Sequence, residues 1–184
     1  MRPLFARVLG EDAFAALPGA VRRLHEGGAF AGEAVVEGPE GLLARFVAAA
    51  VGFPASAARV PVRVTITPEG DGEVWQRDFG GRRFRSAMVL SAAGLEERLG
   101  LFVFRVAVPV DRHGLRVVVS GWHCLGVRLP LVLAPIGDAV EGQDDEGRFR
   151  FDVTVRLPLG LGRVVRYRGW LRPAGAGPER PTAA

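Results

Sequence analysis

Three histidines are the first residues to consider for chemistry, because an imidazole titrates near neutral pH and binds metals. No pair among His25, His113 and His123 has the spacing at which a helix presents two ligands to one zinc ion. His123 precedes Cys124, but neighbouring residues on a strand point to opposite faces, so the imidazole would not reach the thiol. We therefore predict no metal site, and we expect Cys124 to be a small buried apolar residue.

An arginine between two aromatic residues is the second feature with possible chemistry. Trp75, Arg77 and Phe79 stand at alternate positions of a strand-like segment and would share one face of a sheet. The guanidinium then either stacks on the indole ring or is set into a pocket, and the sequence does not decide between these two interpretations. Tyr167 would carry a hydroxyl into the interior, where it needs a hydrogen-bond partner, and Glu97 and Arg77 are the candidates.

A small enzyme built on His25, Glu97, Arg77 or Tyr167 is one hypothesis, and it requires these side chains to converge in a cleft. The sequence has no Gly-x-Ser-x-Gly motif for a nucleophilic serine and no Gly-x-Gly-x-x-Gly turn for a dinucleotide. His25 also has a structural explanation, since the dipole of a helix favours a cation at its C-terminus. We assign no catalytic residue and no cofactor, and we favour a function without catalysis.

The composition narrows the partners that we expect. All basic residues are arginines, which explains a calculated pI of 10.7 beside a formal net charge of only +4. They alternate with apolar residues, as Arg148 and Arg150 do, and form no basic blocks, so we expect no nucleic-acid partner. A single cysteine fits a reducing compartment, and we expect a cytoplasmic protein. The absence of any run of about 18 apolar residues predicts no membrane span.

Helical spacing dominates the first quarter of the chain. Short helical turns are predicted around Phe5 and Phe14, a helix begins at Pro18, and residues 31–36 form a strand. A further helix follows Pro39, in which apolar residues repeat every three or four positions. We expect the apolar face of this helix, around Phe46, to be buried as a plug or lid of the fold.

From Val60 onward the apolar period changes from 3.6 to 2, and this change decides the fold class. We interpret residues 95–99 as a helical turn, because charged residues interrupt the alternation there. Residues 125–135 are predicted to be a buried connection of short extended pieces. The strand-like runs are 60–67, 74–79, 82–90, 102–110, 115–122, 139–141, 147–157 and 163–171.

These runs predict an antiparallel sheet of about eight or nine strands in near-meander order. Parallel neighbours would need crossover connections of about a dozen residues, which are missing. A sheet of this size with one apolar face must close on itself or roll around the helices. We predict a mainly β (α+β) domain over residues 1–173, curled into a barrel or half-barrel, with two or three short N-terminal helices packed on it or plugging it. Residues 174–184 are predicted to be a disordered tail.

A series of short motifs, in fixed order, covers nearly all of the chain before this tail. In order and spacing the chain resembles the bacterial domain of unknown function 4166, a family often found behind saccharopine-dehydrogenase-like NAD(P)-binding domains. The resemblance implies no activity, because the family carries no assigned catalytic residues. The motifs are Leu17-Pro18, Leu24-His25, Trp75, Arg77, Phe79-Gly80-Gly81, Phe84, Glu97, Gly100, Leu129-Pro130, Gly147-Arg148-Phe149, Asp152-Val153 and Tyr167-Arg168-Gly169-Trp170-Leu171.

The leading hypothesis for function is a noncatalytic module that binds a hydrophobic or lipid-like small molecule in a barrel cavity. The same side chains could equally fill the interior, and cavity volume separates the two outcomes, since ligand sites generally start near about 300 Å³. The alternative suggested by the fused relatives is an accessory domain that docks on an NAD(P)-dependent oxidoreductase through an exposed apolar patch. The predicted ligand-binding residues are His25, Trp75, Arg77, Phe84, Met88, Glu97, Phe102, Phe104, Phe149, Phe151 and Tyr167.

Overall fold

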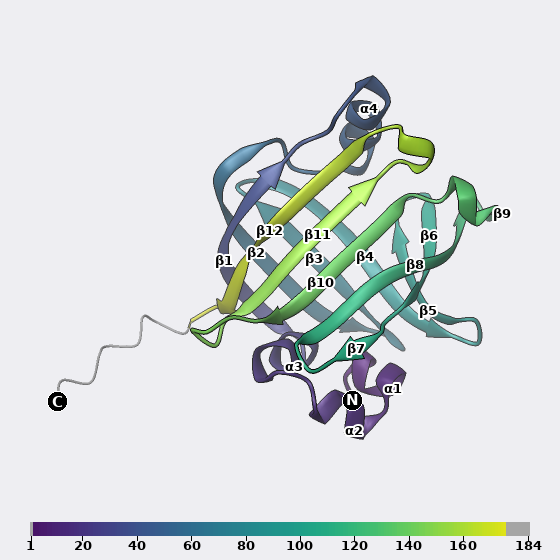
Figure 1. Ribbon diagram of the computed structural model, residues 1–184. Helices are drawn as coiled ribbons and strands as arrows, with labels where there is room; N and C mark the ends of the chain where they lie inside the picture. The colour runs from purple at the N-terminus through teal and green to yellow at the C-terminus, as the bar shows by residue number, and fades with distance from the viewer. Residues whose placement is uncertain (1, 176–184) are drawn as a thin grey trace.

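The computed structural model describes residues 2–175 and consists of a closed antiparallel β-barrel with short helices at its two ends (Figure 1). Ten strands form the barrel, and the pairing of β8 with β10 closes it. In order around the barrel they are β1 (Gly28–Glu37), β2 (Ala57–Glu69), β3 (Gly72–Phe79), β4 (Arg82–Ser91), β5 (Gly94–Leu99), β6 (Phe102–Ala107), β8 (Gly114–Cys124), β10 (Ile136–Gln143), β11 (Phe149–Arg156) and β12 (Arg163–Pro173).

The predicted antiparallel fold class is therefore confirmed, and the strand count is higher than expected. Two further short strands, β7 (Val110–Asp111) and β9 (Val127–Leu129), pair only with β8. The first strand and the last strand, β1 and β12, lie side by side along most of their length. At Gly32 and Gly169 an added Cβ would overlap a backbone carbonyl of the other strand, so only glycine permits this approach.

The two ends of the barrel carry different helices. Three helices, α1 (Leu4–Leu9), α2 (Glu11–Ala15) and α3 (Gly19–His25), cover one end, which we call the helix end (Figure 1). A fourth helix, α4 (Leu42–Val51), connects β1 to β2 at the opposite end, the α4 end. The 3₁₀ turns η1 (Leu131–Leu133) and η2 (Pro158–Gly160) lie at the same end, because η1 precedes β10 and η2 follows β11 there.

Apolar side chains of the helix end and the strands share one core. Phe5 from α1 and Val21 and Leu24 from α3 are almost fully buried and belong to the same cluster as the inward-facing residues of the strands. Because the alternate residues of each strand point outward, the barrel wall is apolar inside and polar outside. The helix end is thus closed by the hydrophobic core itself.

The segment of residues 95–99 was predicted to be a helical turn, and this prediction is wrong. It forms strand β5, paired with both β4 and β6. Leu95 and Glu97 are on the inward face, while Glu96 and Arg98 are on the other face. The charged residues obscured the period of two because one of them, Glu97, lies inside the barrel.

Two further predictions of burial are also wrong, and both concern the α4 end. Residues 125–135 contain β9 and η1. Their large side chains are exposed, because these elements extend beyond the end of the barrel wall. Helix α4 exposes Phe46 and instead buries Ala44 and Ala48 against β12. Small alanines let a helix lie close to a sheet, so the larger side chains of α4 point away from it. Apart from residues 174 and 175, the predicted tail lies outside the described residues.

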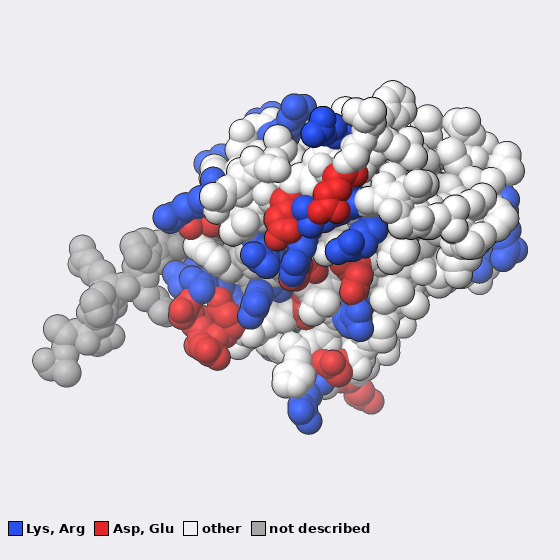
Figure 2. All heavy atoms as spheres, turned by 45° about the horizontal axis from the view of Figure 1, so that its top comes forward, with Lys and Arg blue, Asp and Glu red and all other residues white. Residues whose placement is uncertain are grey.

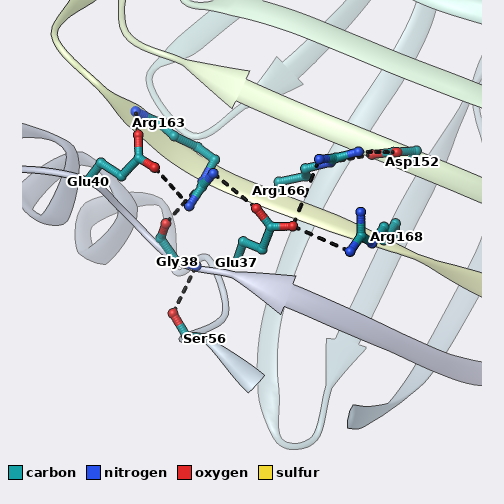
Figure 3. Close-up of polar contacts among 8 residues, drawn as sticks. All are labelled: Glu37, Gly38, Glu40, Ser56, Asp152, Arg163, Arg166 and Arg168. Atoms are coloured by element: carbon teal, nitrogen blue, oxygen red, sulfur yellow. Dashed lines mark hydrogen bonds and ion pairs between the residues drawn. The ribbon is translucent and has the colours of Figure 1, made fainter. Parts of the chain in front are cut away.

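The outer face of β1, β11 and β12 carries a ladder of ion pairs (Figure 3). Arg163 contacts Glu37 and Glu40, each at 3.0 Å, and Arg166 contacts Asp152 at 2.7 Å. Arg168 lies 3.7 Å from Glu37 and extends the ladder along β12. These pairs make the wall hydrophilic, as expected for a barrel whose apolar residues point inward.

None of the helices in the described part of the chain has the length and apolar composition needed to cross a membrane.

Candidate functional site

A cavity of about 200 Å³ lies inside the barrel and is lined mainly by apolar side chains. Its wall receives residues from nearly every strand, and Val47 and Val51 of α4 border it at the α4 end. Of the predicted ligand-binding residues, His25 does not line it. The others do: Trp75, Arg77, Phe84, Met88, Glu97, Phe102, Phe104, Phe149, Phe151 and Tyr167.

Arg77 extends from β3 into this cavity and makes only one close polar contact. Its Nη1 donates a hydrogen bond of 2.9 Å to Ser86 Oγ, while Nη2 lies 3.7 Å from Glu97 Oε1, beyond hydrogen-bond distance. The guanidinium carbon lies 4.9 Å from the centre of the Trp75 ring and 5.5 Å from that of Phe84. Arg77 therefore both stacks on aromatic rings and reaches the cavity, so the two interpretations of the sequence apply together.

Tyr167 brings a phenol hydroxyl from β12 to the cavity. Its ring packs against Phe79 at 5.0 Å and Phe151 at 6.1 Å between centroids. No residue in the described range 2–175 makes a hydrogen bond with the hydroxyl, so neither predicted partner, Arg77 or Glu97, is bonded to it. Burial raises the pKa of Tyr167 to about 12, although the charge of Arg77 acts against this rise. The phenol stays protonated and keeps a free donor facing the cavity.

A buried polar cluster lies beneath the cavity, between α3 and the strands. His25 Nε2 is 2.7 Å from Glu141 Oε2, and the Phe5 ring covers the imidazole at 3.7 Å between centroids. Glu73 accepts a hydrogen bond of 2.8 Å from Trp75 Nε1, and burial raises the pKa of this carboxyl group. At the helix end His25 is fully buried and Glu141 is largely buried, and Glu141 also lines the cavity.

The residues named for an enzyme do not converge as a group. Arg77 and Glu97 form a long ion pair, Tyr167 has no hydrogen-bond partner among the described residues, and His25 pairs with Glu141 instead. Sequence reasoning missed Glu141 and Glu73. Glu141 could have been found from its position in the alternation of inward and outward residues, because it shares the inward face of β10 with Ala139.

His113, His123 and Cys124 do not line the cavity. His113 lies in the exposed turn before β8, next to Arg112. Cys124 is half-buried, which corrects the expectation of full burial, because it ends β8 where the strand leaves the core. Within residues 2–175, no three His, Cys, Asp or Glu side chains come together as metal ligands.

The α4 end forms a second candidate site, a broad apolar surface around the barrel mouth. Figure 2 turns this end toward the viewer and shows a wide area without charged side chains, with both basic and acidic residues at its margins. Among the described residues, every large exposed hydrophobic side chain except Val110 and Val140 belongs to this end. They are Leu42, Leu43, Phe46, Leu101, Leu125, Val127, Leu131, Val132, Leu133, Ile136, Leu159 and Leu161.

Comparison with known families agrees with the resemblance that the motifs suggested. A family model described as a domain of unknown function (DUF4166) matches residues 17–171, so the chain belongs to this family. A search of curated proteins found no match.

Proposed function

We propose that the barrel is a noncatalytic binding module for a small hydrophobic molecule that has one polar end. The observation that carries this proposal is the Tyr167 hydroxyl, which has no hydrogen-bond partner among residues 2–175 and lies on the wall of a mainly apolar cavity. The hydroxyl faces the cavity, so its hydrogen-bond partner comes from water or from a ligand that enters the cavity. A ligand with an acceptor group can take this hydrogen bond.

The size of the cavity narrows the ligand class. Its volume of about 200 Å³ is below the ~300–1,000 Å³ of sites for drug-sized ligands, which argues against a whole lipid as the occupant. An apolar cavity of about 150 Å³ holds benzene. We therefore narrow the hypothesis from a lipid-like molecule to one of a single ring or a short branched chain.

The polar groups of the wall indicate what the other end of the ligand carries. Arg77 has one neutral hydrogen bond and one long ion pair, so guanidinium N–H groups remain for a further acceptor. Tyr167 is close enough for the charge of Arg77 to act on its pKa. Two donors from neighbouring groups favour a carbonyl or carboxylate on the ligand, although Glu97 reduces the net charge of this region.

The test measures binding of toluene and 4-methylbenzoate to the protein by ligand-observed NMR. Palmitate serves as a size control. Binding of both small probes is expected, with palmitate excluded. Tyr167→Phe should weaken binding of 4-methylbenzoate by about 1.5–3 kcal/mol, or roughly 12- to 160-fold, because one hydrogen bond to a charged acceptor is lost. Binding of toluene should not change.

A matched pair of valines controls for the fold. Val153 lines the cavity, whereas Val140 is exposed on the outside of the neighbouring strand. Val153→Phe should abolish binding of both probes, and Val140→Phe should leave it intact. If the folded protein binds neither probe, or if Val153→Phe binds as the natural sequence does, the proposal is wrong. Native mass spectrometry of freshly purified protein would then identify any natural occupant.

A second proposal, docking on an NAD(P)-dependent oxidoreductase, has one supporting observation. It requires an exposed apolar patch, and the α4 end is a surface of that kind. Co-purification with a dehydrogenase, lost on Phe46→Asp, is the result that would support it.

A further inference from the structure

The apolar side chains of the α4 end come from separate segments that surround the barrel mouth. Helix α4 contributes Leu42, 82% exposed, and Phe46, 72% exposed. The turn after β8 contributes Leu125, 71% exposed, and η2 contributes Leu159. A monomeric protein rarely leaves this many large hydrophobic side chains together in water. Exposed patches of this kind mark interaction sites.

Several positive charges of this end have no acidic partner among the described residues. The acidic residues Glu37, Glu40 and Asp78 of this end are paired with arginine, the two glutamates with Arg163 and the aspartate with Arg83. By contrast, four exposed arginines have no acidic side chain within 4.0 Å among the described residues. They are Arg45 on α4, Arg82 after the β3–β4 turn, Arg128 on β9 and Arg156 at the end of β11.

We propose that the α4 end docks on an anionic lipid bilayer, with the barrel mouth facing the membrane. Leucine, valine and phenylalanine side chains enter the boundary between headgroups and acyl chains, about 5–10 Å deep, as in other interfacial anchors. The unpaired arginines then lie at the level of the lipid phosphates, which attract basic residues close to the surface. This docking does not depend on whether the cavity holds a ligand.

The types of residue distinguish a bilayer from a protein partner. Hot spots of protein interfaces are enriched in tryptophan, tyrosine and arginine, with leucine and valine under-represented. Of the three enriched types, only arginine is exposed at the α4 end in the described part of the chain. Eleven aliphatic residues and one phenylalanine make up the exposed apolar set at the α4 end, without tryptophan or tyrosine. Aliphatic side chains make few directional contacts with a partner. Insertion into a fluid lipid surface does not require such contacts.

The test is sedimentation of the full chain with vesicles of phosphatidylcholine alone, and of three parts phosphatidylcholine to one part phosphatidylglycerol. Binding to the anionic vesicles is expected, with weaker binding to the neutral ones. Salt at about 1 M, where the Debye length is about 3 Å, should reduce binding to the anionic vesicles towards the neutral level. Equal binding to both vesicle types in low salt would contradict the role of the arginines.

Matched variants separate docking from general hydrophobicity. Phe46→Asp should weaken vesicle binding about tenfold or more, since it removes a large apolar side chain that docking would bury in the lipid. Val140→Asp, on an exposed residue of the barrel wall, should leave it unchanged. In the same way Arg45→Gln with Arg128→Gln should weaken binding to anionic vesicles, while Arg23→Gln with Arg150→Gln should not.

Two outcomes would overturn the proposal. The first is no binding to anionic vesicles, or binding that Phe46→Asp leaves unchanged. The second is stable association with a protein, a second copy or a dehydrogenase, that Phe46→Asp disrupts while vesicles fail to bind. Circular dichroism and urea unfolding of each variant show that any loss of binding is not a loss of the fold.

Discussion

The two ends of the barrel use similar residues for opposite purposes. At the helix end Phe5 is 1% exposed and packs inside the core, whereas Phe46 at the α4 end is 72% exposed. Both phenylalanines lie on short helices with an apolar stripe, so periodicity alone does not distinguish them. What differs is the opposite face of each helix: α4 already packs through Ala44 and Ala48. The helix end thus serves stability, and the α4 end is available for interaction.

Substitution of these two phenylalanines gives the largest expected contrast. Phe5→Ala should lower the free energy of unfolding by about 3–5 kcal/mol, because it leaves a cavity in a closed core. Phe46→Ala should change it by less than about 0.5 kcal/mol, as is usual for an exposed position. Urea unfolding followed by tryptophan fluorescence measures both. Comparable losses for the two variants would mean that α4 is part of the core.

Much of the wall of the barrel could be predicted from the sequence. The alternation after Val60 predicted an antiparallel sheet, and it also predicted which residues of β3, β4, β11 and β12 face inward. Phe84, Phe149 and Tyr167 all line the cavity for this reason. Strand periodicity is a local property, and each residue's face follows from its neighbours two positions away.

Features that depend on distant contacts could not be predicted in this way. The pair of His25 and Glu141 joins residues 116 positions apart, and no local pattern indicates it. Closure through β8 and β10 and the pairing of β1 with β12 are likewise long-range. The orientation of α4 was wrong because the larger apolar stripe was assumed to be buried, whereas packing favoured the smaller alanine face.

The pH dependence of stability sharpens the account of the helix end. Burial raises the pKa of Glu73, so the folded protein holds this proton more tightly than the unfolded chain does. The stability that this protonated carboxyl group contributes is fully present below the pKa of Glu73 in the unfolded chain. It is lost as pH rises through the pKa of Glu73 in the folded protein. Glu73→Gln keeps an oxygen for Trp75 and should be more stable than the natural sequence at pH 7, with the difference vanishing near pH 4. A constant difference across this range would contradict the shift.

The smallest effect is expected on the outer wall. Arg166 and Asp152 form a half-exposed ion pair at 2.7 Å, and the pair lowers the pKa of Asp152. Arg166→Gln should cost no more than about 1 kcal/mol, because solvent screens such pairs. As the pKa of Asp152 is depressed, the cost should disappear as pH falls through that pKa. A loss comparable with that of Phe5→Ala would show that the ladder of Figure 3, not the core, holds β11 to β12.

Hydrogen exchange followed by mass spectrometry, with and without phosphatidylglycerol-containing vesicles, tests the difference between the two ends most directly. The account predicts slower exchange with vesicles in residues 42–51, 125–136 and 158–161, because docking covers these segments. Exchange in residues 4–25 should not change. Protection at the helix end, or no protection at the α4 end while the protein is sedimented with the vesicles, would contradict it.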